Sequence, residues 1–219
     1  MLQELAQLNV LLVDDHPAVR FGIRALIAEE PDMQLVAEHG SASADTVEVA
    51  GWADVVVVDY HLGERDGLWL AQQIKRRSAA PPVLIYSAFA DAQLAVAAIV
   101  AGADGLLAKA TLAEELSVAI RRLASGRQYF PAIPPSLAAA LCARFEPVDQ
   151  AICSMLIHGV PPAEIGERLG LAPVELEARR GSILHAIAPR TTRTRVLDAA
   201  RAPLDYDRPR RVLRYPAPK

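Results

Sequence analysis

Five short apolar runs constrain the fold of this chain more than any other feature of its sequence. They lack the polar alternation of a half-exposed strand, so we expect strands that are buried on both faces. Stretches of helical length separate them, which predicts an open, doubly wound, five-stranded parallel sheet with helices on both faces, an α/β fold. The expected strands cover 10–13, 34–37, 55–58, 83–86 and 105–108, and the expected helices cover 17–29, 43–50, 67–77, 91–101 and 112–124.

Several residues mark where these helices begin. Pro17 suits a first helical position, and Asp91 can cap the helix that follows it. Thr111 and Glu114 have the spacing of a capping box, which predicts the start of the fifth helix.

The pattern changes after residue 126. Prolines at 131, 134 and 135 indicate a linker, and no further buried-strand pattern follows. Gly170 and Pro173 are placed to end one helix and begin the next across a short turn, which predicts a helix–turn–helix. The expected helices of this all-α part cover 147–157, 162–169, 173–187 and 191–200.

Charge is distributed unevenly along the chain. Residues 1–143 hold 10 basic and 17 acidic side chains, whereas residues 144–219 hold 13 basic and 9 acidic ones. A basic C-terminal part suggests a polyanionic partner such as DNA, and the Pro- and Arg-rich segment 201–219 contributes most of this charge. The alternative is that this segment is a solvated end.

Composition excludes other classes. A content of 52% hydrophobic residues in 219 predicts a folded core in one or two domains. No apolar run approaches the roughly 18 residues of a membrane span, and the first residues lack the pattern of a signal peptide. We therefore expect a cytoplasmic protein with no membrane partner. Cys142 and Cys153 are too few for a disulfide framework or a zinc site, so we expect free buried thiols.

Charged and polar side chains follow the expected strands, at the sheet edge where ligands of such folds bind. Asp14 and Asp15 follow the first strand and Asp59 the third, while Ser87 ends the fourth and Lys109 follows the fifth. Three converging carboxylates repel one another unless a cation joins them, and hard oxygen ligands suit Mg²⁺. The hydroxyl and the ammonium can bind phosphoryl oxygens, and a carboxylate can be the nucleophile that forms an aspartyl phosphate.

Over residues 8–125 the sequence resembles the receiver domain of bacterial two-component response regulators, a flavodoxin-like fold. The resemblance implies that Asp59 is the phosphoacceptor, with a sensor histidine kinase as partner. It implies that Asp14, Asp15 and Asp59 hold Mg²⁺ together with the main-chain carbonyl of His61. It also implies that Ser87 is the switch hydroxyl and Lys109 its ion-pair partner. The matching motifs are Val13-Asp14-Asp15-His16, Val58-Asp59, Tyr86-Ser87-Ala88 and the run from Ala101 to Lys109.

The sequence departs from the receiver pattern in places. Gly63 occupies a position where proline is common, which predicts a looser loop after Asp59. Leu106 occupies a position where many receivers have the aromatic residue that moves with the switch hydroxyl, which predicts a different or weak readout. His16 and His61 flank the pocket; we expect solvated loop histidines there, since an Mg²⁺ site does not favour imidazole.

The expected helix 91–101 has no charged side chain after its cap. A helix that covers one face of a sheet normally has a polar outer stripe, so its outer side needs a cover. We expect Leu94, Ala95, Ala98 and Ile99 either to form a homodimer interface or to dock the C-terminal domain. The alternative is that outward alanines are tolerated in solvent.

The block from residue 145 to 200 resembles the four-helix DNA-binding domain of the NarL/LuxR type. Together with the receiver it implies a DNA-binding transcription regulator, with Glu177, Arg179 and Arg180 as candidate DNA contacts. Glu177 stands where lysine is common, and Arg180 falls in an otherwise apolar stripe. A second hypothesis is therefore a domain that no longer reads DNA and binds protein. The matching positions are Pro147, Gly159, Glu164, Ile165, Leu169, Gly170, Ile183 and Leu184.

These observations predict four segments: a receiver at 1–126, a linker at 127–143, a helix–turn–helix domain at 144–200 and a basic tail at 201–219. An enzyme with its own substrate is not expected, because no Ser/His or Cys/His constellation occurs at a recognisable spacing.

Overall fold

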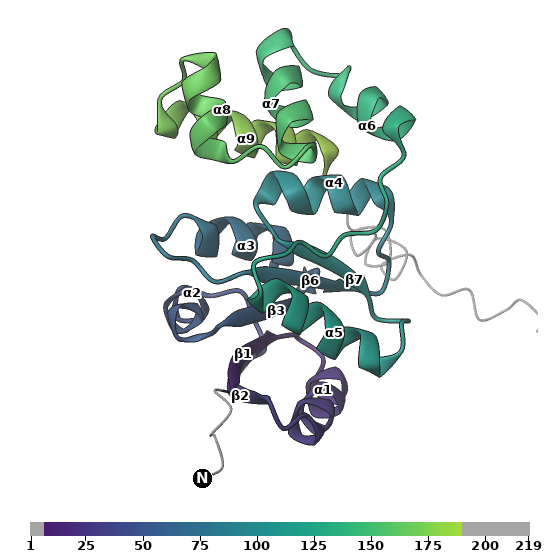
Figure 1. The fold of residues 1–219 in the computed structure, drawn as a ribbon. Helices are drawn as coiled ribbons and strands as arrows, with labels where there is room; N and C mark the ends of the chain where they lie inside the picture. The colour runs from purple at the N-terminus through teal and green to yellow at the C-terminus, as the bar shows by residue number, and fades with distance from the viewer. Residues whose placement is uncertain (1–6, 190–219) are drawn as a thin grey trace, which may run out of the picture. The chain divides into compact units, whose positions relative to one another are not determined.

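A computed structural model describes residues 7–189 (Figure 1). Its N-terminal part contains the expected five-stranded sheet, in which every strand pairs in parallel with its neighbours in the order β2-β1-β3-β6-β7. Crossover helices alternate with these strands, so the predicted doubly wound α/β fold is confirmed. The strands are β1 (Leu8–Val13), β2 (Met33–His39), β3 (Val55–Asp59), β6 (Val83–Ser87) and β7 (Gly105–Ala108).

Helices cover both faces of the sheet. Alternate residues of a strand point to opposite faces, so Val10 and Leu12 pack with α1 and α5, while Leu11 and Val13 pack with α3 and α4. The three central strands are buried almost throughout, as their unbroken apolar runs predict. The helices are α1 (Pro17–Glu29), α2 (Ala44–Val49), the short 3₁₀ helix η1 (Ala50–Trp52), α3 (Gly67–Lys75), α4 (Ala92–Ala101) and α5 (Ala113–Ala124).

Two helix starts are as predicted, among them Pro17 as the first residue of α1, and one is not. The Asp91 carboxylate accepts a hydrogen bond from the amide of Leu94 at 2.7 Å and caps α4. The capping box at Thr111 and Glu114 is wrong, because α5 begins one residue later and its cap is Leu112. The hydroxyl of Thr111 donates instead to the carbonyl of Ala108 at 2.7 Å, at the end of β7.

The loop after Asp59 forms a small antiparallel hairpin that the sequence does not predict. Its strands are β4 (His61–Leu62) and β5 (Arg65–Asp66). Gly63 lies in the two-residue turn with φ of +75°, which proline cannot adopt and which other residues rarely adopt. Glycine at this position therefore belongs to an ordered turn rather than to a looser loop.

The second part of the described chain is helical, and we call residues 135–187 the helical region. Helix α6 (Pro135–Cys142) lies inside the expected linker 127–143, because Pro135 opens a helix after an extended Pro134. Helices α7 (Pro147–Ile157), α8 (Pro162–Leu169) and α9 (Pro173–Ile187) begin and end as predicted. The expected helix 191–200 and the tail 201–219 lie outside the described residues.

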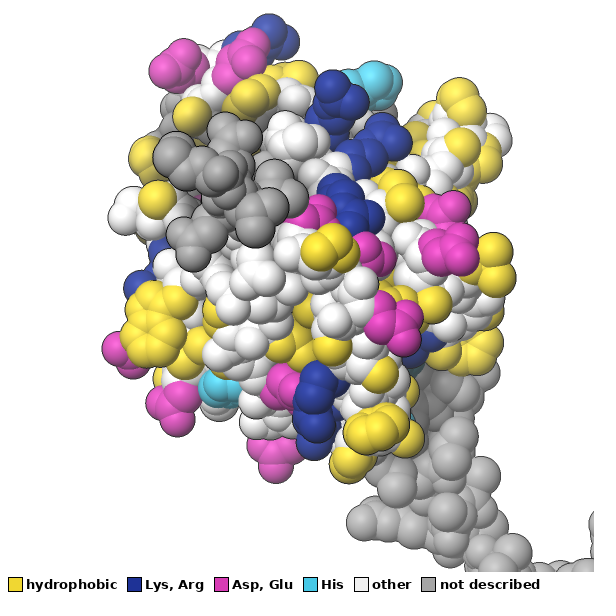
Figure 2. All heavy atoms as spheres, turned by 60° about the horizontal axis from the view of Figure 1, so that its bottom comes forward, with side chains coloured by type: hydrophobic (Ala, Val, Ile, Leu, Met, Phe, Trp, Pro, Cys, Tyr) yellow, Lys and Arg dark blue, Asp and Glu magenta, His cyan; other side chains and the backbone are white. Residues whose placement is uncertain are grey.

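The surface of the described part is mixed in charge. On the face in Figure 2, acidic, basic and apolar side chains are interspersed. Within residues 7–189 there is no helix with the length and apolar character that crossing a membrane requires.

Candidate functional site

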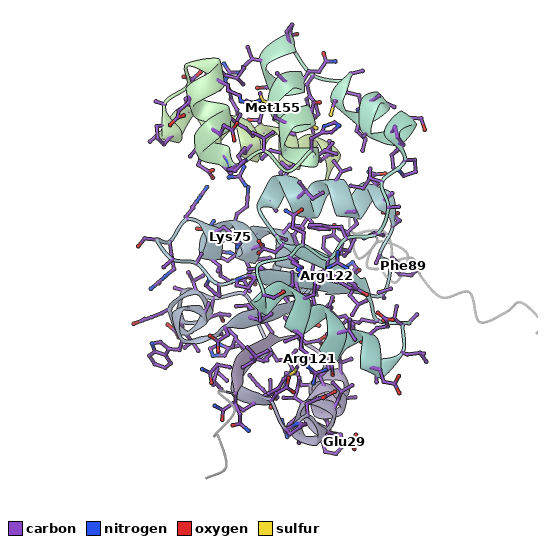
Figure 3. All side chains as sticks on the ribbon, viewed as in Figure 1. Glu29, Lys75, Phe89, Arg121, Arg122 and Met155 are labelled. Carbon is purple, nitrogen blue, oxygen red and sulfur yellow. The ribbon has the colours of Figure 1, made fainter. Side chains whose placement is uncertain are left out.

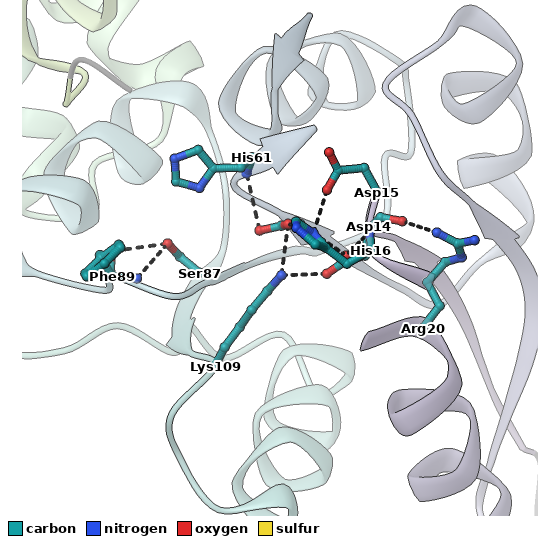
Figure 4. A network of polar contacts seen from close by, with 9 residues as sticks. Asp14, Asp15, His16, Arg20, His61, Ser87, Phe89 and Lys109 are labelled. Carbon is teal, nitrogen blue, oxygen red and sulfur yellow. Dashed lines mark hydrogen bonds and ion pairs between the residues drawn. The ribbon is translucent and has the colours of Figure 1, made fainter. Parts of the chain in front are cut away.

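Three carboxylates meet at the carboxyl ends of β1 and β3, as predicted (Figure 4). Asp14 and Asp15 directly follow β1, and Asp59 is the last residue of β3. One oxygen of each carboxylate and one ring nitrogen of His16 lie within 4.8 Å of one another. Asp14 and Asp59 are buried and Asp15 is partly exposed. Because β1 and β3 are parallel neighbours, their ends place these acids on one edge of the sheet.

Backbone amides hold the two buried carboxylates in place. The amide of His16 donates to Oδ1 of Asp14 at 2.8 Å. The amide of His61 donates to Oδ1 of Asp59 at 3.2 Å, which places the backbone of His61 beside the expected phosphoacceptor. Each carboxylate thus accepts from the amide two residues further on, and the turn after each strand fixes its orientation.

Lys109 completes the pocket from β7. Its Nζ lies 2.6 Å from Oδ2 of Asp14 and 2.9 Å from Oδ2 of Asp59. Burial lowers the pKa of Lys109, but its hydrogen bonds to these two carboxylates outweigh that effect and raise it overall. Burial raises the pKa of Asp59, and Lys109 opposes that rise. Lys109 therefore stays charged, while Asp59 is a partly desolvated carboxylate, as a nucleophile in a dry pocket should be.

His16 is closer to the acids than a solvated loop histidine would be. Its side chain is 60% exposed, yet Nδ1 lies 2.7 Å from Oδ1 of Asp15 and 3.8 Å from Oδ2 of Asp59. The ring of His61 packs edge-on against the ring of Tyr60 at 4.7 Å between centroids. The expectation of solvated histidines is thus met in exposure for His16, but not in its contacts.

Ser87 is turned away from the acids. Its hydroxyl donates to the carbonyl of Phe89 at 3.1 Å and accepts from the amide of Phe89 at 3.2 Å (Figure 4). The main chain of Ser87 is nevertheless tied to the pocket, because its carbonyl accepts from the amide of Lys109 at 2.7 Å. A rotation of the Ser87 side chain is therefore needed before its hydroxyl can face Asp59.

The donor set fits a hard divalent cation. Three carboxylates and the ammonium of Lys109 converge here, so acidic groups outnumber basic ones among these four side chains. The ligand atoms on Asp14, Asp15 and Asp59 are oxygens, which suit Mg²⁺ better than softer metals. These residues are therefore compatible with a magnesium site.

The outer side of α4 is covered by the helical region (Figure 1). Helix α4 contacts α9, α7 and α6, and its residues from Leu94 to Ala101 are all buried. This packing accounts for the missing polar stripe, so solvent-exposed alanines need not be invoked. Leu94, Ala95, Ala98 and Ile99 lie where the docking alternative places them, whereas their role in a homodimer stays a prediction.

Polar contacts fix α9 to the sheet-containing part at its middle and at its C-terminal end. Toward its C-terminal end, the carbonyl of Ile187 accepts from Nε2 of Gln93 at 3.1 Å. The carbonyl of Pro189 accepts from the hydroxyl of Tyr60 at 2.8 Å. Burial raises the pKa of Tyr60 to about 12, so its hydroxyl remains a donor near neutral pH. Tyr60 directly follows Asp59 in sequence, so this contact joins the residues just after α9 to the loop of the expected phosphoacceptor.

Arg180 makes the third polar contact and is buried, 6% exposed, at the C-terminal end of α4. Its Nε and Nη2 donate to the carbonyl of Val100 at 3.3 and 2.9 Å, and its Nη1 contacts the carboxylate of Glu177. Lys75 lies at the same end of α4 (Figure 3), and its ammonium pairs with Asp104 at 2.7 Å. The apolar stripe of α9 thus contains an arginine because that arginine caps another helix.

The other predicted DNA contacts on α9 are also engaged. Arg179 donates to Asp149 at 2.9 Å and to Glu175 at 3.2 Å, both within the helical region. Glu177 pairs with Arg180, as described above. In this conformation Arg180 is buried and the partly exposed Arg179 is already paired with two carboxylates, which qualifies the prediction made from their positions alone.

Known proteins match this chain over most of its length. The family model of the response regulator receiver domain matches residues 10–121. The transcriptional regulatory protein UhpA of Salmonella typhimurium is 31% identical, over 82% of this chain and 91% of UhpA. The chain belongs to the response regulator family. It is thus a regulator of a two-component system, and not an enzyme, as its sequence predicts.

Two further relatives place this response regulator more closely. The nitrate/nitrite response regulator NarL of Escherichia coli is 28% identical over 74% of this chain and 81% of NarL. A solved structure of a LuxR-family response regulator from Aurantimonas sp. aligns with a TM-score of 0.54 and 31% identity, over 60% of this chain and 93% of that one. The predicted NarL/LuxR resemblance is therefore confirmed.

Sequence reasoning missed the residues that hold α9 of this response regulator. Tyr60 and Gln93 carry no local signal, because their partners lie 129 and 94 residues further along the chain. Arg180 had one signal, since a charged residue in a buried stripe must find a partner.

Gly67 gives a direct test of how tightly the Asp59 backbone is held. A Cβ on Gly67, the first residue of α3, would lie 2.4 Å from the carbonyl oxygen of Asp59. We expect Gly67→Ala to displace Asp59, to lower stability by about 1–3 kcal/mol and to slow labelling by acetyl phosphate. Gly22→Ala is the control, because a Cβ there meets no atom within 4 Å. If Gly67→Ala had the same urea midpoint and the same labelling rate as the unsubstituted protein, the expectation would be wrong.

Proposed function

We propose that this response regulator is a transcription regulator whose DNA binding is controlled by phosphorylation of Asp59. The observation that carries the proposal is the pocket of Asp14, Asp15, Asp59 and Lys109, joined in one chain to a helical region docked on α4. UhpA, which this chain matches over 91% of its length, is a transcriptional regulatory protein. The proposed segments remain a receiver at 1–126, a linker at 127–143, a helix–turn–helix domain at 144–200 and a tail at 201–219.

Asp59 is proposed to accept the phosphoryl group of a sensor histidine kinase. An oxygen of its carboxylate attacks phosphorus, and the histidine nitrogen leaves. Asp14, Asp15, Asp59 and the carbonyl of His61 would hold Mg²⁺, which supplies positive charge against the phosphoryl oxygens. Lys109, already 2.9 Å from Asp59, would bind one of those oxygens, and Ser87 would turn from Phe89 to bind another.

Docking of α9 on α4 is proposed to be the unphosphorylated state. Arg180, Gln93 and Tyr60 hold α9 through hydrogen bonds to the backbone. In this state α9 cannot enter a DNA groove, because part of its surface is buried against α4. Phosphorylation would weaken the docked state and free α9. The hydrogen bond of Tyr60 would carry the change at Asp59 to α9, because the aromatic residue that moves with the switch hydroxyl in many receivers is replaced here by Leu106.

A second candidate is a regulator whose helical region binds protein and no longer reads DNA. The observation that favours it is the charge of α9, where Glu175 and Glu177 accompany Arg179 and Arg180. Carboxylates near a phosphate backbone are repelled, and both arginines already have partners within the chain. Under either candidate the protein would be cytoplasmic and meet a kinase, and a homodimer through α4 would require undocking.

A mobility shift against genomic fragments separates the two candidates. With acetyl phosphate and Mg²⁺ we expect a shifted complex, and we expect it to weaken steeply as salt rises if arginines reach phosphates. Without phosphodonor, or with the metal chelated, the complex should be much weaker. A folded protein that gains the phosphoryl mass but shifts no fragment under any condition would favour the protein-binding candidate.

A further inference from the structure

The two cysteines of the chain lie in contact, although they are 11 residues apart. Cys142 ends α6 and Cys153 lies in the middle of α7. The thiol of Cys142 donates to the sulfur of Cys153 at 2.9 Å. Both are free thiols, 4% and 0% exposed. Two sulfurs this close are within reach of a chemical reaction with each other.

The fold holds the sulfurs at this separation. Helices α6 and α7 pack against each other across a short turn, in which the amide of Phe145 donates to the carbonyl of Cys142 at 3.1 Å. A disulfide has an S–S length of about 2.05 Å, so roughly 0.9 Å of approach would close the bond.

A cavity reaches one of the two cysteines. A cavity of about 670 Å³ lies between α4, the connecting segment, α6 and α7, and Cys142 is among its lining residues. Its walls also include Ile99, Phe130, Ile157 and His158, and Cys153 does not line it. The two thiols therefore differ in access, and Cys142 would meet a molecule from solvent first.

We propose that Cys142 and Cys153 are a reversible disulfide site that responds to hydroperoxides. In the first step the sulfur of Cys142 attacks the peroxide, ROOH, and breaks its O–O bond. The products are the sulfenic acid of Cys142 and the alcohol ROH, or water when the peroxide is H₂O₂. In the second step the sulfur of Cys153 attacks that of Cys142; hydroxide leaves and takes the proton of the Cys153 thiol, so water is released.

The environment of Cys153 supports this order of events. Burial raises the pKa of the Cys153 thiol well above its usual range, so it is a poor first nucleophile. Its sulfur lies 2.9 Å from that of Cys142, which makes it the resolving thiol. A nucleophile held next to its target reacts at a high effective concentration, even when little of it is in the thiolate form. Intracellular disulfides that do form are commonly transient and redox-sensing, which fits a reversible pair.

The bond would join two neighbouring helices of the helical region, α6 and α7. Helix α6 follows the segment that leaves the sheet-containing part, and α7 packs on both α4 and α9. Oxidation would therefore fix α6 to the helix that contacts both α4 and α9. This site is independent of Asp59, so it stands or falls separately from the proposed phosphorylation.

The test is the mass of the intact full-length protein after H₂O₂ and after subsequent dithiothreitol. We expect a loss of two hydrogen atoms per chain, no thiol left for alkylation and full reversal by dithiothreitol. Because the chain has two cysteines, an intramolecular bond is distinguished from a crosslinked dimer by non-reducing electrophoresis. Thiols that remain alkylatable, a sulfinic or sulfonic product, or only crosslinked dimers would overturn the proposal.

Single variants then test the order. Cys153→Ala should leave a sulfenic acid at Cys142 that a dimedone probe labels, whereas Cys142→Ala should leave Cys153 unlabelled. Labelling of Cys153 and not of Cys142 would contradict the assigned roles. The result on the parent protein stands even if a variant fails to fold.

Discussion

Replacing Asp59 by asparagine is expected to abolish phosphorylation of this response regulator. The amide lacks the anionic oxygen that attacks phosphorus, and no other carboxylate of the pocket is the expected acceptor. Incubation with acetyl phosphate and Mg²⁺ should add one phosphoryl group to the parent chain and none to Asp59→Asn, as read from intact mass. Phosphorylation-dependent DNA binding should vanish with it.

The variant should fold, so a negative result is interpretable. Burial raises the pKa of Asp59, which means that folding stabilises its ionised carboxylate less than solvent does in the unfolded chain. A neutral amide removes this cost, and Lys109 keeps its partner Asp14 at 2.6 Å. We expect a urea midpoint at or above that of the parent.

Glu64→Gln is the matched control for the acid-to-amide change. Glu64 is exposed in the turn of the hairpin that follows Asp59. It should be labelled like the parent chain. A mass gain on Asp59→Asn equal to that of the parent would show that another residue accepts the phosphoryl group and would refute the assignment.

Replacing Arg180 by methionine is expected to loosen α9 from α4. The carbonyl of Val100 lies in the last turn of α4, where helix carbonyls lack a partner within the helix. Arg180 supplies two donors and a positive charge at that end, which the helix dipole favours. Methionine keeps the apolar stem but leaves the carbonyl buried and unpaired.

The expected size of this effect follows from the charge on the donor. Hydrogen bonds from charged groups contribute about 1.5–3 kcal/mol, so we expect the docked state to lose about 2 kcal/mol. That corresponds to roughly a thirtyfold change in the ratio of docked to undocked molecules. Amide hydrogen exchange along α4 and α9 measures it directly, since undocking exposes both helices.

Arg179→Met is the control on the same helix. Arg179 pairs with Asp149 and Glu175, both inside the helical region, so its loss removes no contact to α4. Its exchange pattern along α4 should match that of the parent. Unchanged exchange in Arg180→Met would mean that apolar packing alone holds α9, and the proposed role of Arg180 would be wrong.

The sequence by itself determined the sheet, the order of its helices and the acids of the pocket. Unbroken apolar runs such as 55–58 are strands because a parallel sheet buries both faces. Asp14, Asp59 and Lys109 meet because the carboxyl ends of parallel strands share one edge, so placing each residue on its strand already places it in the pocket. Each of these patterns spans only a few residues, yet together they determine which distant residues meet in the pocket.

Only the tertiary structure decided what covers α4 and why α9 contains a buried arginine. Arg180 and Val100 are 80 residues apart, and the thiols of Cys142 and Cys153 come together through the packing of two helices. Contacts of this kind leave no periodic pattern in the sequence, because the pattern along one helix does not show which residue of another helix it will contact. The hairpin at Gly63 and the start of α5 at Ala113 were also not predicted, although their contacts are local: Leu62 pairs with Arg65, and the hydroxyl of Thr111 donates to the carbonyl of Ala108.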